Sequence, residues 1–481
     1  MASNPLRITI FHTNDMHGRM EAMARLSAFA RQLRREAEAE GRRVFFWDAG
    51  DALDRRFRAC GLSKGAALAP VLNAMGYSLM AMGNDIALTY GPQAMSALAK
   101  RLSFPVLAAN FRDGDGPLIA GLQESATFPA GEGISLGVFG LTAPWEGMYE
   151  GFGIHMPDSL QTARRLVRSL QGAGATVIVV LSHQGLEDDK RLVEAVEGID
   201  LVIGGHSHTR LETGVEHQGV LIAQAGDFAQ ALGVIELEID AASGRLLRRT
   251  ARLEKVPVDG PADPAFLAAL AQAETEAEAI AAQVIGEALH ELALDFRAEC
   301  ALGNLAADAL RDRMRAEAAL IIAGQFRQGL PAGKITLGDL DSCSSSTANP
   351  QRTRVRGAQI VEALERGLDP EVSQASPHSL RGTPIGRPQI SGIAVEYDPR
   401  SAVRRRVRKV LIHGEPLVPD RMYWLAHTDA ETFEGIGVLT LEPDQVTESE
   451  RPTIVREVIE DYVRAHSPLA APKLDRWRQA G

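Results

Sequence analysis

The sequence predicts an α/β fold for the first ~250 residues and a smaller α+β domain after them. Short apolar and β-branched runs alternate with amphipathic helical patterns in the N-terminal half, which is typical of α/β proteins. The chain has 481 residues, more than one core usually organises, because domains hold ~100–200 residues. After an Ala- and Glu-rich segment at 261–283 the regular alternation stops, which indicates a second domain of a different class.

The first domain is expected to begin with a strand at Leu6–Phe11, a short β-branched run. A helix is expected at Met20–Ala39, because Met23, Leu26 and Leu33 fall on one helical face. By the same patterns, further strands are expected at Val44–Trp47, Ser78–Met82, Val106–Ala108, Ile134–Leu141, Val177–Leu181, Leu201–Ile203, Leu221–Gln224 and Val234–Ile239. Further helices are expected at Ala66–Met75, Pro92–Leu102, Leu160–Leu170 and Lys190–Val196.

A connecting helix is expected between the domains, since Phe266, Leu270, Ala273 and Ala277 have helical spacing within a segment bounded by Pro261. We expect the first domain at residues 1–258, this helix within 259–284 and the second domain at 285–481. In the second domain we expect helices at Leu302–Met314 and Ala358–Gly367, a loop at Leu330–Gly338, and strands near Ile390–Tyr397, Lys409–His413 and Tyr423–Ala426.

Composition and charge narrow the classes of function. The formal charge is -11, so no positive field draws the chain to a nucleic acid polymer or an anionic membrane. No apolar run reaches the ~18 residues of a membrane-spanning helix, and no signal-peptide pattern precedes the first strand, so a cytoplasmic protein is expected. Cys60, Cys300 and Cys343 are odd in number and far apart, and we expect buried thiols. Nothing in the sequence sets the oligomeric state.

Five short segments place carboxylate, amide and imidazole side chains directly after expected strands. They are Asp15-Met-His17, Gly50-Asp51, Gly83-Asn84-Asp85, Ser182-His183 and Gly205-His206-Ser-His208. In an α/β sheet, residues past the carboxyl ends of the strands converge on one crevice, so these segments are expected to meet.

The chemistry expected of such a cluster is metal binding. Side chains at i and i+2 of an extended segment point the same way, so each Asp-x-His or His-x-His pair can reach one ion. Mixed carboxylate, imidazole and amide ligands suit Mn, Zn, Fe or Co, and two such ions can activate a water against a phosphoryl group. Each segment alone is typical of ordinary turns, whereas all five together favour a metal site.

The same segments resemble a known family. His12-Thr-Asn-Asp15-Met-His17-Gly, Asp48-Ala-Gly-Asp51, Gly83-Asn84, Leu181-Ser-His183 and Gly204-Gly-His206-Ser-His208 resemble the calcineurin-like metallophosphoesterases of the bacterial 5′-nucleotidase type. Leu302-Gly-Asn-Leu-Ala-Ala-Asp308, the stretch from Leu330 to Asp339, the stretch from Arg356 to Glu365 and Gln389-Ile-Ser-Gly392 resemble the substrate-binding domain of that family. The resemblance implies a β-sandwich flanked by helices, followed by a 5′-nucleotidase-type C-terminal domain.

The resemblance also implies roles for individual residues. One metal ion would be held by Asp15, His17 and His208, the other by Asn84, His183 and His206, with Asp51 bridging them. Asp51, Asn84, Asp85 and His183 are the candidate catalytic residues, and Arg327 is the candidate substrate-binding residue. Asp48 and His12 either orient ligands or make ordinary strand-end hydrogen bonds, and Gln224 is a further candidate for contact with the site.

The sequence departs from the family at its usual catalytic His and Asp and at its two nucleobase-binding aromatic residues. The usual His and Asp that stabilise the transition state or protonate the leaving group are replaced by Asp85 and Leu88. An Asp beside two cations stays ionised and is a poor acid, so it would instead ligate metal or accept a hydrogen bond from substrate. The two aromatic residues that sandwich a nucleobase are replaced by Arg387 and Val438; Phe433 is a possible substitute, although we expect a core residue there.

The function expected from these patterns is hydrolysis of a phosphate monoester, with a nucleotide as substrate by resemblance only. Hydrolysis of a sulfur ester or thiosulfonate stays open, because a better leaving group does not need the missing acid. A metal-binding relative with little or no turnover also stays open. We further expect the second domain to rotate and bring Arg327 toward the metals.

Overall fold

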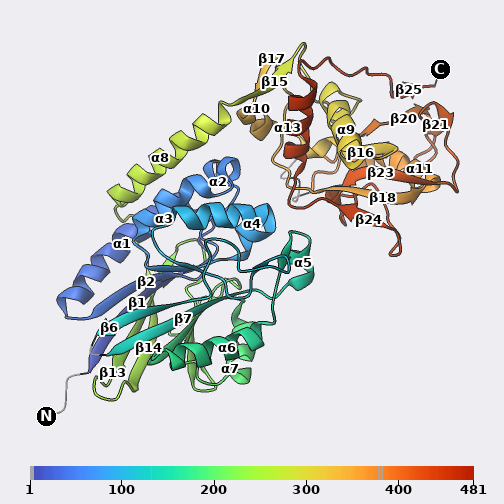
Figure 1. Cartoon of the computed structure of the whole chain (residues 1–481). Coiled ribbons are helices and arrows are strands. Elements are labelled where there is room, and N and C mark those ends of the chain that lie inside the picture. The colour runs from blue at the N-terminus through green and yellow to red at the C-terminus, as the bar shows by residue number, and fades with distance from the viewer. Residues whose placement is uncertain (1–4, 132, 378–379, 381–382, 481) are drawn as a thin grey trace. The chain divides into compact units, whose positions relative to one another are not determined.

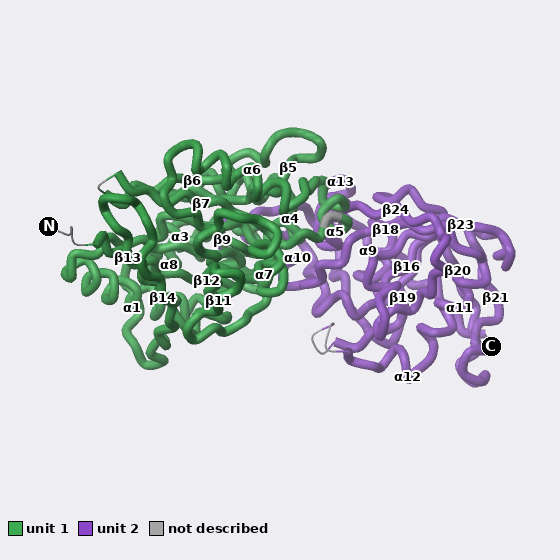
Figure 2. Tube along the Cα trace, turned by 90° about the horizontal axis from the view of Figure 1, so that it is seen from below, with its two compact units in different colours: residues 1–277 green, residues 278–481 purple. Residues whose placement is uncertain are grey.

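The computed structural model describes residues 5–131, 133–377, 380 and 383–480, which form two compact units. Unit 1 is Met1–Ala277 and unit 2 is Glu278–Gly481, coloured separately in Figure 2. Helix α8 (Pro264–Ala281) joins them, and its Phe266, Ala273 and Ala277 pack into the core of unit 1. None of the described helices is long and apolar enough to cross a membrane.

Unit 1 contains two facing sheets of six strands each among the described residues. The first has the order β14-β13-β1-β2-β3-β4, with β1 (Leu6–Thr13), β2 (Arg43–Asp48), β3 (Leu79–Ala81), β4 (Val106–Leu107), β13 (Ala231–Ile239) and β14 (Leu246–Lys255). The second has the order β11-β12-β10-β9-β7-β6, with β6 (Ser125–Gly131), β7 (Ile134–Thr142), β9 (Val177–His183), β10 (Leu201–Ile203), β11 (Val215–His217) and β12 (Val220–Ala223). A two-stranded pair, β5 (Arg112–Asp113) and β8 (Ile154–His155), lies outside them.

Alternating side chains explain how the sheets pack. Ile8 and Ile10 of β1 face the core between the sheets, where Val179 and Leu181 of β9 meet them. Phe11 of β1 lies in a second core with α1 (Met20–Ala39), α3 (Ala69–Met75) and α4 (Asn84–Arg101). A third core joins the other sheet to α6 (Ser159–Gly172) and α7 (Leu186–Ala195), as Figure 1 shows. Two short helices, α2 (Arg58–Ser63) and α5 (Glu146–Glu150), complete the unit. The expected β-sandwich flanked by helices is confirmed.

The sheets differ from the expected pattern at two places. Strand β6 pairs with β7 although its sequence, which includes Pro129, does not show a strand pattern. Helix α4 begins at Asn84, eight residues before the expected start, and its helical geometry breaks at Gly91, where φ is 74° and ψ is -171°. Pro92 follows the break because proline fits a new first turn and cannot continue the preceding one.

Unit 2 is the expected smaller α+β domain. Its five-stranded sheet has the order β19-β16-β23-β18-β24, and a four-stranded sheet has the order β22-β21-β20-β25. The strands are β15 (Val284–Ala288), β16 (Ala318–Ile322), β17 (Gly333–Thr336), β18 (Pro350–Arg356), β19 (Pro388–Ser391), β20 (Ile393–Tyr397), β21 (Val407–Ile412), β22 (Glu415–Pro416), β23 (Met422–Thr428), β24 (Thr447–Ser449) and β25 (Trp477–Gln479). The helices are α9 (Ala301–Met314), α10 (Leu337–Cys343), α11 (Gly357–Gly367), α12 (Pro370–Ser373) and α13 (Val455–His466).

Three expectations for unit 2 need correction. The segment expected as a loop at Leu330–Gly338 contains β17, which pairs with β15 and buries Ile335. The single strand expected near Ile390–Tyr397 is two strands, because Gly392 adopts a φ of 72° between them. Strand β18 and helix α13 were not expected at all. The expectation for the cysteines is confirmed, since Cys60, Cys300 and Cys343 are buried and free.

Candidate metal centre

The candidate ligands lie in loops at the carboxyl ends of parallel strands in unit 1. Strands β1 and β2 pair in parallel, and their ladder continues past the strand ends, with Asp15 N donating to Gly50 O at 2.9 Å and His17 N to Asp51 O at 3.0 Å. Strand β9 pairs in parallel with β10 and carries His183 at its end. The sheets therefore bring these segments together as the topology predicts.

The backbone of these loops adopts an uncommon conformation. Asp15, His17, Asp51, His206 and His208 all have positive φ, between 46° and 74°. Side-chain-bearing residues adopt this region rarely, at a cost of ~1–3 kcal/mol each where it is strained, and such residues cluster at functional sites. Five of the seven candidate ligands share this feature, so the loops hold their side chains in place against a local backbone cost.

The carboxylate of Asp15 has one oxygen without a hydrogen-bond partner. Its Oδ2 accepts bonds from Asn14 Nδ2 at 2.7 Å and from His206 N at 2.8 Å. Its Oδ1 is buried and unpartnered, and it faces three imidazole nitrogens, the Nε2 atoms of His208 at 3.5 Å, His17 at 3.7 Å and His183 at 3.8 Å. A buried anionic oxygen surrounded by nitrogen lone pairs fits a divalent cation.

Asp15 belongs to two groups of side chains that could each hold a metal ion. One consists of Asp15, His17 and His208, and the other of Asp15, Asp51 and His183; in each the ligand atoms lie within 4.8 Å of one another. His183 Nε2 lies 3.0 Å from Asp51 Oδ2 and 3.2 Å from Asn84 Oδ1. The structure thus places Asp15 in both groups, and the bridging role of Asp51 stays a prediction.

Each of three histidines has a partner on the nitrogen that faces away from the centre. His183 Nδ1 lies 2.7 Å from Ala49 O, a carbonyl that only accepts, so Nδ1 carries a proton and the neutral form of the ring presents the lone pair of Nε2 to the centre. His17 Nδ1 lies 3.0 Å from Asp85 Oδ2, and His208 Nδ1 lies 3.1 Å from Asp227 Oδ2. Carboxylates behind imidazoles are typical of metal sites, where they fix the ring and raise its basicity.

The facing nitrogens of His17 and His208 also fit a cation. Their Nε2 atoms are 3.0 Å apart, so two neutral rings with protonated Nδ1 atoms would place one lone pair against the other. A cation between or beside two such lone pairs removes their repulsion. The ring of Phe228 lies 5.9 Å from each of the two imidazoles and covers this side of the centre.

Asp85 and His206 have surroundings that the sequence did not reveal. The carboxylate of Asp85 lies behind His17, and its backbone N–H donates to Asp51 Oδ1 at 3.0 Å. His206 is half-buried, with its ring 4.6 Å from Trp145 and 5.2 Å from His183, and it belongs to neither of the two ligand groups above. Its backbone N–H on Asp15 is its clearest link to the centre.

The electrostatics of the centre favour positive charge. Burial favours the neutral ring of His183, but Asp51 and Asp15 outweigh it and raise the pKa of His183 to about 10. Burial, together with the nearby His183, lowers the pKa of His206 to about 4. The two carboxylates therefore stabilise one cationic group between them, which is the place and sign of charge that a metal ion supplies.

Close backbone approach explains two glycines of the motifs. A Cβ on Gly83 would lie 1.9 Å from Asp51 Oδ1, and one on Gly205 would lie 2.9 Å from both Ala49 O and His183 Nδ1. These positions have no room for a side chain, so the glycines bring the ligand loops into contact.

Gln224, Asp48 and His12 were the further candidates near the centre. Gln224 and Asp48 hold ligand loops in place, whereas His12 contacts none of the candidate ligands through a hydrogen bond. Gln224 Oε1 accepts from Thr209 N at 2.5 Å and its Nε2 donates to Gly205 O at 2.7 Å, so it braces the loop that carries His206 and His208. Asp48 accepts from Gly50 N at 3.0 Å and holds the loop before Asp51. His12 is buried without a hydrogen-bond partner on either nitrogen, and burial lowers its pKa to about 4.

A cavity of about 320 Å³ borders the candidate centre within unit 1. It is lined on one side by His17, Asp85 and His208 and elsewhere by residues that include Arg55 and Tyr90. The cavity is large enough for a phosphate group and part of an ester, so a substrate can reach the ligands of this unit.

Unit 2 holds the candidate substrate residues. Arg327 is exposed at the end of the turn after β16, where its backbone N donates to Cys343 O at 2.8 Å. Val438 is fully buried, so it offers no stacking surface. The expectation of a core residue at Phe433 is wrong, because its side chain is 62% exposed on the turn after the η4 helix (Asp429–Glu431).

Sequence patterns did not reveal Asp227 and Phe228. Both directly follow Gln224-Ala-Gly226, a segment after β12 at the same edge of the sheet, and Phe228 N donates to Asp15 O at 2.9 Å. The position of Asp227 past the end of a strand was the signal available in the sequence, but a single Asp after a Gly is typical of turns.

Comparison with known proteins assigns the two parts of the chain to two domain families. The chain matches the calcineurin-like phosphoesterase family over residues 8–210 and the 5′-nucleotidase C-terminal domain over residues 282–440. It is 26% identical over 429 residues to the uncharacterized metallophosphoesterase YunD of Bacillus subtilis (strain 168), covering 89% of this chain and 93% of that protein. It is 25% identical over 518 residues to a 5′-nucleotidase of Diplobatis ommata, covering 96% of this chain and 88% of that protein.

A solved structure shares the fold over the full length. The NAD nucleotidase of Haemophilus influenzae superimposes with a TM-score of 0.62 and 16% sequence identity, and the match covers 100% of both chains. At this identity the likeness concerns the fold alone.

Proposed function

Because the chain belongs to the calcineurin-like metallophosphoesterases of the 5′-nucleotidase type, we propose that it hydrolyses phosphate monoesters at a centre of two divalent metal ions. The family is one of metal-dependent phosphoesterases. The observation that carries the proposal is the buried, unpartnered Oδ1 of Asp15, which faces the Nε2 atoms of three histidines. Mn, Zn, Fe and Co all suit this set of ligands.

The residues of unit 1 hold and orient the reacting groups. Asp15, His17 and His208 would hold one ion, and Asp51, Asn84, His183 and His206 would complete the other site. Two divalent ions held by these residues would supply a water of lowered pKa and neutralise the phosphoryl oxygens. Asp85 and Asp227 keep His17 and His208 in the tautomer that presents Nε2. From unit 2, Arg327 would bind the phosphate of the substrate.

Protonation of the leaving group is the step for which unit 1 offers no clear donor. At the two positions where relatives of this type carry a His and an Asp, this chain has Asp85, whose carboxylate is engaged by His17, and the apolar Leu88. We therefore expect the rate to depend strongly on the leaving group, high for p-nitrophenolate and low for a ribose 5′-alkoxide. A thiosulfonate or other sulfur ester is the second candidate substrate, because its leaving group needs no proton.

A nucleotide is the default biological substrate in this proposal. Its support is the resemblance of the C-terminal half to the 5′-nucleotidase domain and the name of the Diplobatis ommata relative. The lack of aromatic side chains at positions 387 and 438 weakens base stacking, which contributes ~1–3 kcal/mol per base in comparable settings.

Metal analysis followed by an ester panel tests the proposal. Protein loaded with Mn should contain two ions per chain and hydrolyse p-nitrophenyl phosphate much faster than AMP. Asp51→Asn should lose at least one ion, because a neutral amide binds a cation weakly, whereas Asp115→Asn in an exposed loop should keep both. One ion or none in the unmodified protein would contradict the dinuclear site, and bound metal without turnover of any ester would favour a non-catalytic relative.

A further inference from the structure

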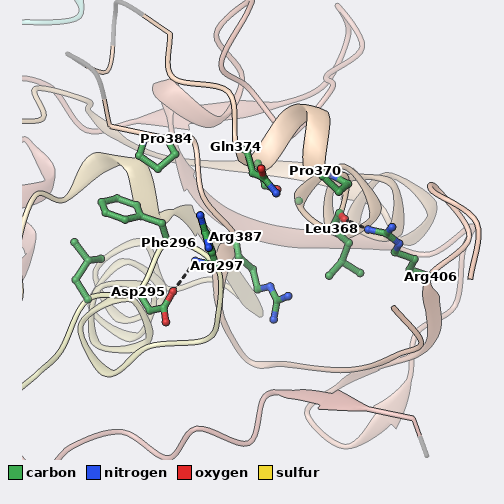
Figure 3. A pocket seen from close by; sticks show the side chains of 12 residues that line it. Asp295, Phe296, Arg297, Leu368, Pro370, Gln374, Pro384, Arg387 and Arg406 are labelled. Carbon is green, nitrogen blue, oxygen red and sulfur yellow. Dashed lines mark hydrogen bonds between the residues drawn. The ribbon is translucent and has the colours of Figure 1, made fainter. Parts of the chain in front are cut away.

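Unit 2 contains a cavity of about 620 Å³ that the proposed chemistry does not use. Figure 3 shows Asp295, Phe296, Arg297 and Arg387 on one side of it and Leu368, Pro370 and Arg406 on the other. These residues come from the segment before α9, the end of α11 with α12, the segment before β19 and the segment before β21. All of them belong to one compact unit, so the cavity is a property of that unit.

The lining of this cavity is positively charged in a chain of net charge -11. Arg297, Arg387 and Arg406 line it, and Asp295 is the one acidic residue among the lining residues. The Asp295 carboxylate accepts a hydrogen bond from the backbone N of Arg297 at 2.7 Å. This bond orients the carboxylate, and three guanidinium groups against one carboxylate leave the cavity with an excess of cationic groups.

The three arginines have no carboxylate partner among the described residues, whereas Arg404 and Arg408, two residues either side of Arg406, each have one. Arg404 pairs with Asp369 at 2.9 Å, and Arg408 pairs with Asp398 at 3.4 Å. Within the part of the chain that the structure describes, no acidic side chain lies within 4.0 Å of the guanidinium groups of Arg297, Arg387 or Arg406. Three guanidinium groups without an acidic partner among the described residues therefore line the cavity.

Arg387 is held so that its donors remain available. Its guanidinium lies 5.1 Å from the ring centre of Tyr397 and 5.4 Å from that of Trp477, and Nη1 donates to Tyr397 OH at 3.3 Å. Its backbone N donates to Phe296 O at 2.7 Å. Stacking on rings occupies the face of a guanidinium and leaves most of its in-plane N–H groups free to bind an oxyanion.

Arg406 is held through both its side chain and its backbone. Its Nη1 donates to Leu368 O at the end of α11, and its backbone N donates to Glu365 Oε2 at 3.0 Å. Carbonyl partners position a guanidinium without neutralising it. The cavity therefore presents preorganised cationic groups, which lowers the entropy lost when an anion binds.

The wall of the cavity is continuous with the turn that leads to Arg327. Gly324 N donates to Ile385 O at 2.9 Å, and Thr383 Oγ1 donates to Gly324 O at 2.9 Å. Pro384, which lines the cavity, has its carbonyl 2.4 Å from where a Cβ on Gly324 would lie. A ligand in the cavity is thus bound by the same unit, and beside the same turn, that carries the candidate phosphate-binding residue.

We propose that this cavity binds an anionic group, a phosphate or a carboxylate, and that the group belongs to the substrate in addition to its scissile phosphate. This rests on the proposed phosphoesterase function. An uncharged nucleobase would leave three guanidinium groups uncompensated, whereas an oxyanion can accept several charge-assisted hydrogen bonds from them. The substrate is then a doubly anionic ester. A free anion that regulates the enzyme would use the same chemistry.

Arginine modification tests anion binding without any turnover. The full chain, loaded with Mn, is treated with phenylglyoxal at constant ionic strength, with inorganic phosphate or with chloride, and the rate at each arginine is read by peptide mass spectrometry. Phosphate should slow modification of Arg297 and Arg387 several-fold and leave exposed Arg405, which does not line the cavity, unchanged. Equal rates at Arg297, Arg387 and Arg405 in the two buffers would overturn the anion site whatever the outcome of the activity assays.

Matched substrates identify the source of the anion. The unmodified enzyme should show a lower KM for 4-carboxyphenyl phosphate than for 4-carbamoylphenyl phosphate, by about tenfold, since only the carboxylate can accept charge-assisted hydrogen bonds. Arg387→Gln and Arg297→Gln should abolish this preference in KM, and Arg405→Gln, outside the cavity, should keep it. Protection by phosphate without the KM preference would assign the cavity to a free anion and overturn the substrate assignment.

Discussion

Asp227 is the residue whose role in the candidate centre is most easily isolated, because it touches one ligand and no other. Its Oδ2 lies 3.1 Å from His208 Nδ1, and the side chain of His208 is 36% exposed, so the ring would otherwise be free to turn. Asp85 stands in the same relation to His17 but also contacts Asp51 through its backbone.

Asp227→Ala is expected to weaken metal binding ~10–100-fold, the usual effect of removing a carboxylate behind a ligating imidazole. Titration of Mn against a fluorescent chelator measures the dissociation constant directly. Asp115→Ala, at an exposed position, is the control and should bind as the unmodified protein does. Unchanged affinity in Asp227→Ala would mean that His208 is not a ligand or is held by other contacts.

His427 gives unit 2 a pH-dependent stability. Burial lowers its pKa to about 4, and its Nε2 and Nδ1 lie against Thr353 Oγ1 at 2.8 Å and Thr428 O at 2.7 Å. The unfolded chain takes up this proton first, near its ordinary pKa of 6.5. The contribution of His427 to stability is therefore present above pH 6.5 and is lost as the pH falls toward 4, by up to about 3 kcal/mol.

The comparison of His427→Gln with the unmodified protein tests this sign. Other groups also titrate in this range, since burial raises the pKa of Glu431 to about 7, so the difference between the two proteins is the relevant quantity. The advantage of the unmodified protein should shrink from pH 7.5 to pH 5, measured by hydrogen exchange of β18 and β23 peptides at each pH. An advantage that stays constant or grows on acidification would contradict a neutral His427.

At the residue scale, the sequence predicted the candidate ligands but not the residues that hold them. Asp15, His17 and His208 were predicted from their spacing at strand ends, and the structure brings their ligand atoms within 4.8 Å of one another. Asp227 was missed because its partner is 19 residues away and the contact exists only after β12 has joined the sheet. The position of Asp85 behind His17, 68 residues away, depends on tertiary structure in the same way.

At the scale of elements, the turn between β3 and α4 controls Asp51. Gly83 begins this turn with extended backbone, φ -78° and ψ -172°, so its requirement is space and not a left-handed conformation. A Cβ there would lie 1.9 Å from Asp51 Oδ1 and 2.5 Å from Asp51 N, which is backbone and cannot move away.

Gly83→Ala is therefore expected to displace the Asp51 loop and remove at least one metal ion, with a loss of stability of ~1–3 kcal/mol from overpacking. Metal content and urea denaturation measure the two effects. Gly172→Ala at the end of α6, where no atom lies within 4 Å of the added Cβ, should keep its metals and its stability. Normal metal content in Gly83→Ala would show that Asp51 can relax without losing a ligand position.

The helices and strands that the sequence predicted well have apolar residues at one regular spacing. Helix α1 matches the expected Met20–Ala39, because one apolar face packs on the sheet. Strand β6 and the first part of α4 were missed, because their pairing depends on neighbours that are distant in sequence or on a break at Gly91. The division of Ile390–Tyr397 into two strands needed the φ of one glycine.

At the scale of the whole molecule, the candidate metal ligands and the candidate substrate-binding residues lie in different units, each with its own hydrophobic core. The seven candidate metal ligands lie between Asp15 and His208 in unit 1, which has its own sandwich core and outer helices. Arg327 and the arginine-lined cavity lie in unit 2, which has separate cores on the two faces of its main sheet. Each unit can therefore fold around its own core, and the chemistry and the recognition of substrate are separable.

Residues 1–281 alone are expected to fold and to bind as much Mn as the full chain, because every candidate ligand and the packing of α8 through Phe266, Ala273 and Ala277 are retained. Hydrolysis of p-nitrophenyl phosphate by this fragment should show a raised KM, since Arg327 is absent. The full chain with Arg327→Gln separates that cause from damage by truncation: its metal content should be normal and its KM about tenfold higher, because the phosphate loses one charge-assisted contact. A folded fragment with the same KM as the full chain would show that unit 2 does not hold the phosphate, and a metal-free fragment would place part of the metal centre outside unit 1.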